Sequence, residues 1–117
     1  MMKKRIAIIA FMILILAVGL SAKKVKTMDN FEIVPNPMYR STTIYVNMSE
    51  PAEVQITIDN LAGETIRTIY AGVCGKSASF LWERDDAEGN YVADGTYYVT
   101  LRYEGRYTST KKTLILK

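Results

Sequence analysis

The residues most able to do chemistry lie close together in the stretch WERDDAEGNYVADGTYYV, residues 82–99. Its carboxylates are Glu83, Asp85, Asp86, Glu88 and Asp94. Carboxylates at this density can act as general acid and base on a glycosidic bond, or can ligate calcium through their oxygens. Asp and Asn also shape turns, because their side chains hydrogen-bond to nearby backbone amides. The stretch is therefore either a reactive or metal-binding loop, or a structural connection.

Catalysis is disfavoured by what the rest of the chain lacks. The sequence has no histidine and a single cysteine, Cys74, which excludes Ser-His-Asp and Cys-His catalysis and the usual zinc sites. A carboxylate pair that hydrolyses glycosides needs a cleft deep enough to raise one pKa and to hold a sugar. A small domain with tight turns offers little material for such a cleft, so we expect a protein that is not an enzyme and has no cofactor.

Calcium is the more serious alternative, and its candidate ligands are Asp85, Asp86, Glu88 and Asn90. The spacing does not match the helix-loop-helix calcium motif. When Gly89 is aligned with the invariant glycine of that motif, Arg84 falls at the first ligand position and no glutamate stands at the twelfth. We expect instead that the acidic residues bond to their own backbone, while Gly89 and Gly95 permit bends that side chains would forbid.

The first 22 residues have the layout of a secretory signal peptide. A basic segment precedes an apolar run of 15 residues, 6–20, and small residues follow it. The run is shorter than the roughly 20 residues that span a bilayer comfortably, which favours a cleaved leader over an uncleaved anchor. No cysteine stands directly after the run, so a lipoprotein anchor is not indicated. We expect an exported protein in the periplasm, at the cell surface or outside the cell, touching the membrane only through an uncleaved leader.

The chain without this leader is electrically neutral. The sequence holds 15 Lys and Arg against 12 Asp and Glu, and subtracting the leader's three basic residues leaves 12 of each sign. A nucleic-acid-binding domain needs a basic face, so nucleic acid is not an expected partner. Residues 23–117 suffice for one domain with one core, which we divide into a short linker, 23–30, and a domain, 31–117. Cys74 can form no internal disulfide, and we expect it to be buried.

The domain alternates apolar and polar residues at period two and has no stretch with helical periodicity. The expected inward-facing sets are Phe31 and Ile33; Ile44, Val46 and Met48; Val54, Ile56 and Ile58; Ala78, Phe80 and Trp82; and Tyr97, Val99, Leu101 and Tyr103. A further strand is predicted over residues 65–70, where Ile66 and Ile69 both face inward only if a bulge intervenes. The last is predicted over residues 107–116. Seven short strands predict an all-β chain, folded as a two-sheet sandwich.

Turn-forming residues separate these strands. The segment Pro35-Asn36-Pro37 ends the first strand, residues 60–63 make a tight reversal, residues 71–76 are predicted as a loop, and residues 105–106 turn the chain. The closing strand is apolar, so it must pair within a sheet or offer itself to another chain. The eight tyrosines could supply an exposed aromatic strip for a partner, although such residues more often cover the outside of a sheet.

Together these residues resemble the immunoglobulin-like domain of the flagellar hook-capping protein and the similar C-terminal sorting domains of the type IX secretion system of Bacteroidetes. The resemblance covers about residues 33–117 and rests on four groups of residues. They are Asn36-Pro37 before Thr42-Thr43-Ile44; Val54, Ile56, Ile58, Asn60, Gly63, Glu64, Ile66 and Arg67; Trp82, Asp86, Gly89, Val92, Gly95 and Tyr97; and Lys111, Lys112, Leu114, Ile115 and Leu116. One departure is that Glu83-Arg84 stands where the family usually has Asp-Gly, so that turn must be made differently or lost.

The resemblance implies an immunoglobulin-like β-sandwich of about seven antiparallel strands, and it leaves the function open. In one interpretation the chain is a free-standing exported module that binds another envelope or secreted protein, with its oligomeric state undetermined. In a second it is a type IX sorting domain, whose C-terminal strand is read by the export machinery through Lys111, Lys112, Leu114, Leu116 and Lys117. A carbohydrate-binding module using Trp82 or paired tyrosines would need an exposed aromatic platform, but we expect Trp82 to be buried.

Overall fold

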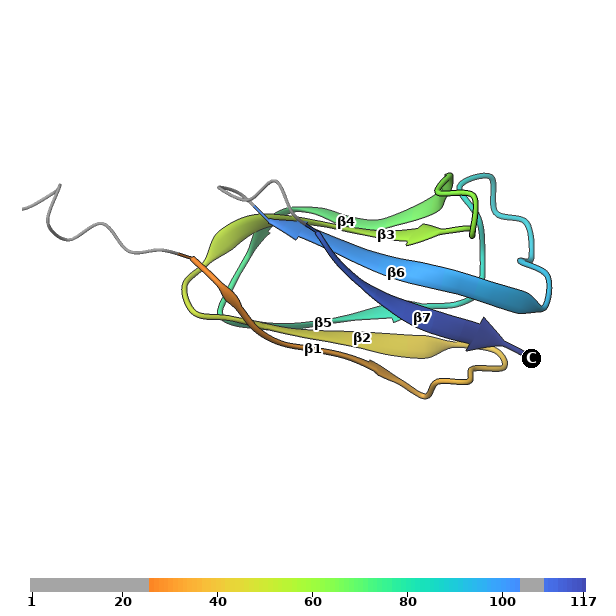
Figure 1. Ribbon diagram of the computed structural model, residues 1–117, viewed down its shortest axis with the longest axis horizontal. Coiled ribbons are helices and arrows are strands. Elements are labelled where there is room, and N and C mark those ends of the chain that lie inside the picture. Colours follow the sequence, from red (N-terminus) through yellow and green to blue (C-terminus); the bar gives the residue numbers. More distant parts are fainter. Residues whose placement is uncertain (1–25, 104–108) are drawn as a thin grey trace, which may run out of the picture.

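The computed structural model describes residues 26–103 and 109–117, and this part of the chain forms seven β-strands in two layers (Figure 1). The strands are β1 (Met28–Val34), β2 (Thr42–Met48), β3 (Ala52–Asp59), β4 (Thr65–Cys74), β5 (Ser77–Trp82), β6 (Gly95–Tyr103) and β7 (Thr110–Leu116). One sheet has the order β1-β2-β5 and the other β4-β3-β6-β7, with every neighbouring pair antiparallel. The predicted all-β sandwich is confirmed.

The leader and the turn predicted at residues 105–106 lie outside the described residues. Within the described ranges, no helix is long and apolar enough to cross a membrane.

The core fills the space between the two sheets with the side chains that the period-two pattern predicts. Ile44 and Val46 of β2 and Ile56 and Ile58 of β3 belong to this core, and all four are fully buried. Burying one such side chain stabilises a fold by roughly 1.5–3 kcal/mol, so the packing can hold the domain without a disulfide. Cys74 is itself buried, as expected, and this burial raises the pKa of its thiol.

Strand β4 is longer than the sequence predicts. The loop predicted over residues 71–76 is wrong for residues 71–74, because β4 continues to Cys74 and stays paired with β3, and only residues 75–76 connect β4 to β5. The misleading residue is Gly72, which sits within the strand under the ring of Tyr70. A Cβ at this position would lie 3.2 Å from the Tyr70 hydroxyl oxygen, which donates a hydrogen bond to the carbonyl of Val73. Gly72 therefore makes room for an aromatic ring and does not end the strand.

The bulge predicted in this strand is confirmed and occurs twice. The ladder between β3 and β4 skips Ile69 and, further along, Ile66, so that neither residue has a partner opposite it on β3. Each skipped residue shifts the alternation by one position. Both isoleucines are consequently partly buried against the core.

The closing strand β7 lies at the edge of its sheet, where it pairs with β6, and its other edge is covered by the segment that follows β1. The Asn36 side-chain amide donates to the carbonyl of Thr113 over 2.7 Å and accepts from the N–H of Ile115 over 3.1 Å. The Met38 N–H donates to the Ile115 carbonyl, and the Met38 carbonyl accepts from the N–H of Lys117. The apolar closing strand is thus paired within the domain, which is one of the two outcomes expected for it.

Candidate functional site: the connection between β5 and β6

The connection between β5 and β6, residues 83–94, contains a tight turn built around Asp86. The Asp86 N–H donates to the carbonyl of Asn90, and the Gly89 N–H donates to the carbonyl of Asp86. One carboxylate oxygen of Asp86 accepts from the N–H groups of Glu88, over 2.9 Å, and Asn90, over 2.8 Å. Gly89 adopts a φ of 86°, a conformation that side chains oppose. Asp86 and Gly89 therefore shape the turn together.

These hydrogen bonds also fix the charge state of Asp86. The pKa of its carboxyl is below the ordinary value, chiefly because the backbone N–H of Asn90 donates to it. Desolvation acts in the opposite direction, and the N–H of Glu88 adds to the lowering. Asp86 is consequently an ionised acceptor. The general acid of a glycosidase needs the opposite shift, a raised pKa.

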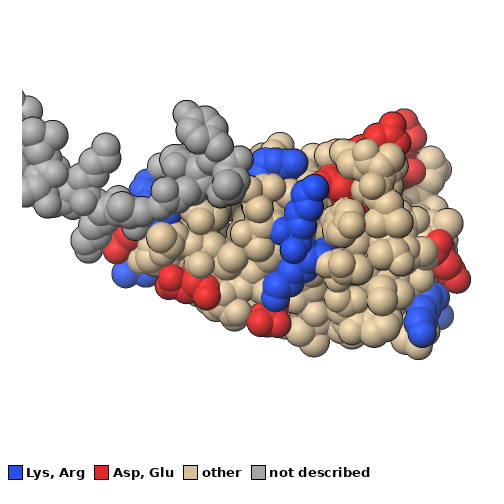
Figure 2. Space-filling view, in the orientation of Figure 1, with Lys and Arg blue, Asp and Glu red and all other residues tan. Residues whose placement is uncertain are grey.

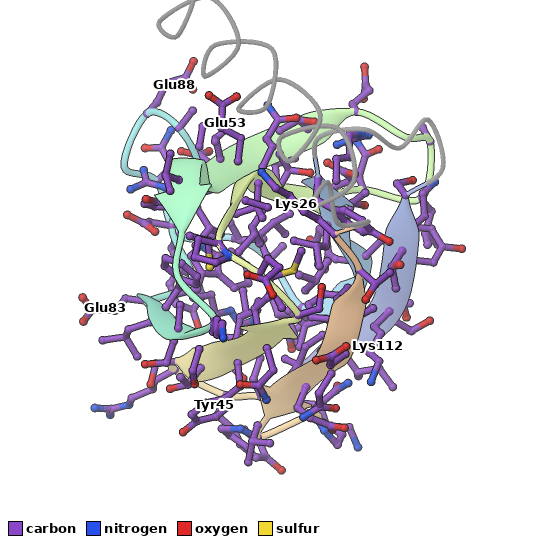
Figure 3. All side chains as sticks on the ribbon, turned by 90° about the vertical axis from the view of Figure 1, so that its left-hand side faces the viewer. Lys26, Tyr45, Glu53, Glu83, Glu88 and Lys112 are labelled. Atoms are coloured by element: carbon purple, nitrogen blue, oxygen red, sulfur yellow. The ribbon has the colours of Figure 1, made fainter. Side chains whose placement is uncertain are left out.

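The other carboxylates of the connection do not converge on one point. Asp85 lies 3.6 Å from the guanidinium of Arg67, which also donates to the carbonyl of Asp86. Glu83 and Glu88 stand apart and both point outward (Figure 3). Among residues 26–103 and 109–117, no three His, Cys, Asp or Glu side chains form a group that could hold a metal ion. Calcium binding by this loop stays a prediction without support from the geometry.

Arg84 has a backbone conformation that explains the departure from the family pattern. Its φ of 64° lies in the left-handed region that glycine adopts most readily. At the position where the resemblance has the glycine of Asp-Gly, an arginine thus holds a conformation that glycine adopts readily. Because this conformation costs a residue with a side chain roughly 1–2 kcal/mol, the contacts of the Arg84 side chain must offset it.

The Arg84 side chain is only 1% exposed and donates hydrogen bonds to three parts of the chain. Its Nε donates to the carbonyl of Val92 over 2.8 Å. Its Nη1 donates to the carbonyls of Tyr39, over 2.5 Å, and Lys117, over 2.8 Å. Its Nη2 donates to the Asp94 carboxylate over 2.5 Å. Arg84 thus ties together the segment before β2, the connection itself and the end of β7.

The surroundings of this guanidinium favour a structural role. Asp94, its ion-pair partner, is 76% exposed, whereas the Arg84 side chain is enclosed. The ring of Tyr91 covers the guanidinium, with its centroid 4.6 Å from Cζ. Four of the five N–H donors of the guanidinium have partners within the domain. Little donor capacity remains for an external anion.

Trp82, which ends β5, is 1% exposed, as expected. Its Nε1 donates to the carbonyl of Asp85 over 2.9 Å, so both the ring and its polar atom are engaged within the domain. A carbohydrate platform formed by Trp82 is therefore excluded. The adjacent tyrosines Tyr97 and Tyr98 are both partly buried, and the Tyr97 hydroxyl donates to the carbonyl of Ala93.

A shallow cleft of about 500 Å³ lies between the β3–β4 turn and the connection. Its walls include Asn60, Asp86, Tyr91 and Tyr97. Asn60 is committed to the turn, because its side-chain oxygen accepts from two backbone N–H groups, and Gly63 completes this turn with a φ of 89°. Polar groups that hold the fold thus supply much of the lining.

The outer face of the four-stranded sheet holds a polar cluster that the alternation pattern does not reveal. Thr57, Asp59 and Thr100 are buried although they alternate with core residues. The Asp59 carboxylate accepts from the hydroxyls of Thr65, over 2.8 Å, and Thr100, over 2.7 Å. Burial alone would raise the pKa of Asp59, but hydrogen bonds from Thr100 and Thr65 outweigh it and hold the pKa below its ordinary value. Both faces of β3 are therefore buried at this end.

The residues of the predicted sorting strand divide between core and surface. Leu114 and Leu116 are buried, while Lys111, Lys112 and Lys117 are exposed. The Lys112 ammonium lies 3.9 Å from the Glu32 carboxylate, which links β7 to β1 across the open side of the sandwich. Basic side chains form only a narrow row on the face drawn in Figure 2, with acidic side chains on either side of it. That face offers no broad basic surface.

Comparison with known proteins identifies the family of this domain. The model of the FlgD Ig-like domain family matches residues 39–106, which is more than half of the chain. The search of curated proteins found no match.

Two solved structures share the fold. One is dimeric latent PorU from Porphyromonas gingivalis, 16% identical, with a TM-score of 0.66 over 81% of this chain and 10% of that one. The other is PorZ from the same organism, a surface component of the type IX secretion system, 22% identical, with a TM-score of 0.53 over 76% of this chain and 12% of that one. The chain spans about a tenth of the length of either protein. Together with its seven-stranded sandwich, the family match shows that this chain belongs to the FlgD Ig-like domain family.

Proposed function

We propose that this chain is a non-catalytic, exported β-sandwich module that docks onto another envelope or secreted protein through the outer face of its three-stranded sheet. The observation that carries the proposal is a group of exposed apolar side chains on this face. Val34, Tyr45 and Leu81 are 54%, 44% and 59% exposed, and each comes from a different strand.

The register of the sheet brings these side chains together. Thr43 of β2 pairs with Val34 of β1 on one side and with Leu81 of β5 on the other, so the three form one row. Tyr45 lies two residues further along β2 and therefore on the same face. Figure 3 shows it projecting away from the sandwich. An apolar group rimmed by polar residues, with a tyrosine among them, is typical of a protein-binding surface.

The contacts of the β5–β6 connection support binding over catalysis. Two of its polar side chains, Arg84 and Asp86, hydrogen-bond to the backbone of the domain itself. The chain has no histidine to serve as general base. The family match and the likeness in fold to PorZ, a surface component of a secretion system, support a module of the cell envelope.

A capture experiment tests the proposed surface. Residues 23–117, which contain both sheets, serve as bait for exported proteins of the same cells. We expect the variant Tyr45→Glu/Leu81→Glu to lose the captured partner. The matched control Gln55→Glu/Thr68→Glu adds the same charge at exposed positions of the other sheet and should retain it. Loss of the partner in the control alone would count against this surface.

A type IX sorting function is the second candidate, and the exposure of three lysines on and just after β7 favours it. Deleting residues 111–117 would not test it cleanly, because the deletion also removes the buried Leu114 and Leu116. The variant Lys111→Gln/Lys112→Gln/Lys117→Gln leaves the core intact. A binding module should still reach the cell surface with these changes, whereas retention of the folded variant inside the cell would favour sorting.

A further inference from the structure

The two sheets have four edge strands, and among the residues that the structure describes only β5 lacks protection against pairing. Proteins block sheet edges with charges, prolines, bulges or covering segments. Strand β7 is covered by Asn36 and Met38, and β4 carries two bulges. Strand β1 has a register irregularity and two acidic residues, Asp29 and Glu32. Strand β5 has no charge, no proline and a regular ladder with β2 over all its six residues.

The phase of this ladder shows which backbone groups of β5 are free. The N–H of Met48 donates to the carbonyl of Lys76, so every second residue counted from Lys76 faces β2. The N–H and carbonyl groups of Ser77, Ser79 and Leu81 therefore point away from β2. Within the described ranges β5 pairs with β2 alone. These three residues present a flat, uncharged row of donors and acceptors.

The inward side chains along this edge are also incompletely covered. Ala78 and Phe80 are only partly buried, whereas their partners on β2, Val46 and Ile44, are fully buried. The ring of Tyr70 packs on Phe80, with centroids 4.8 Å apart, but does not enclose it. A further strand alongside β5 would complete this cover.

We infer that a second copy of this chain pairs antiparallel with β5, and charge complementarity is the reason for choosing this occupant. The uncharged strand is preceded by Lys76 and followed by Glu83, and both are exposed. Figure 3 shows Glu83 pointing away from the sandwich on the β5 side. When β5 of one copy pairs antiparallel with β5 of the other, the end of the strand that carries Lys76 lies beside the end that carries Glu83 in the other copy. This happens at both ends of the paired strands. The strand is therefore complementary to itself.

Symmetry fixes the register of this pairing. A two-fold axis that relates antiparallel edge strands stands perpendicular to the sheet, so the inward side of one copy adjoins the inward side of the other. With Ser79 opposite Ser79 of the second copy, Ser77 faces Leu81, and the free backbone groups of all three residues find partners. The result is a continuous sheet in the order β1-β2-β5-β5-β2-β1. The dimer shares Leu81 with the binding surface proposed above, through the backbone of this residue, whereas Val34 and Tyr45 lie outside the paired strands.

Complementary charges at Ser79 test both the dimer and its register. Residues 23–117 are studied by analytical ultracentrifugation, and we expect the wild-type chain to dimerise. Ser79→Lys and Ser79→Glu each place like charges opposite each other and should weaken dimerisation at least about tenfold. An equimolar mixture of the two variants should dimerise again. Gln55→Lys, an exposed change on the other sheet, should leave the dimer unchanged.

Three results would overturn the inference. A wild-type chain that stays monomeric at concentrations up to about 1 mM excludes the dimer and leaves the edge for a strand of a different protein. Dimerisation of Ser79→Lys as tight as that of the wild type excludes this pairing of strands. A mixture of the two variants no more dimeric than either alone excludes the register. Near-ultraviolet circular dichroism of Trp82 confirms that each variant is folded.

Discussion

Arg84 has a backbone conformation that glycine adopts more readily, and its side chain makes hydrogen bonds that a glycine could not make. An arginine within an acidic loop is ordinarily solvated, and the sequence marks this one only as a departure from the family pattern. Its burial depends on the carbonyls of Tyr39, Val92 and Lys117, which only the tertiary fold brings together. Trp82 was predictable because its place on the inward side of a strand is a local property. Arg84 was not.

Two substitutions at Arg84 separate its backbone role from its side-chain role. Arg84→Ala removes the guanidinium but keeps a side chain at positive φ, so we expect the free energy of unfolding to fall by about 3 kcal/mol. Arg84→Gly loses the same hydrogen bonds but relaxes the backbone, and should be about 1 kcal/mol more stable than Arg84→Ala. Urea unfolding followed by the fluorescence of Trp82 measures both. Equal stability of the two variants would contradict the backbone argument.

Asp59 and Asp86 make stability depend on pH in the acidic range. Both pKa values are lowered in the folded state, so the unfolded chain binds protons more readily. Their stabilisation is complete above the ordinary aspartate range, about pH 4, and is lost as the pH falls through the folded values. We expect the free energy of unfolding to decline on acidification below about pH 4, and to decline less steeply in Asp59→Asn. An unchanged slope would show that the hydrogen bonds from Thr65 and Thr100 do not hold this charge.

The effect of calcium on the melting temperature distinguishes a structural turn around Asp86 from a calcium-binding loop. If the Asp86 carboxylate only accepts hydrogen bonds from the N–H groups of Glu88 and Asn90, Asp86→Ala should lower the melting temperature equally in calcium and in EDTA. The wild-type melting temperature should likewise be the same in both. Calorimetry decides, since a rise with calcium that disappears in Asp86→Ala would establish the metal site instead.

At the scale of elements, periodicity predicted the strands well. It failed at positions where the role of a residue depends on a side chain packed against it. Gly72 suggested a loop because its use as space for the Tyr70 ring is invisible in the sequence. The burial of Thr57 and Asp59 could not be predicted, because alternation indicates the direction of a side chain and not its depth. The bulge at Ile66 and Ile69 was predictable, since two apolar residues three positions apart cannot share one side of a regular strand.

The cover over β7 should depend on the side chain of Asn36. Asn36→Ala removes the donor to the Thr113 carbonyl and the acceptor for the Ile115 N–H, so we expect a loss of roughly 1–2 kcal/mol. Hydrogen exchange at the Ile115 amide should accelerate, while the amide of Val46 in the middle of the other sheet should keep its protection. Unaltered exchange at Ile115 would mean that Asn36 does not close this edge.

At the scale of the whole molecule, three segments that are far apart in the sequence meet at one end of the sandwich. The segment around Asn36, the end of β7 and the β5–β6 connection are joined through Arg84, which fixes one end of the sandwich. The outer face of the three-stranded sheet takes no part in this network and keeps its apolar side chains in solvent. The fold and the family could be predicted from the sequence. This surface could not, because its residues come together only through the register of three strands.

The most direct test of the proposed function is site-specific photo-cross-linking in living cells. A photoreactive residue is placed at Tyr45 or Leu81 and, as matched controls, at Gln55 or Thr68 of the other sheet. We expect one partner protein of the envelope or the secreted fraction to be cross-linked from positions 45 and 81 and not from positions 55 and 68. Cross-links from positions 55 and 68 alone would contradict the assignment of the outer face of the three-stranded sheet as the binding surface.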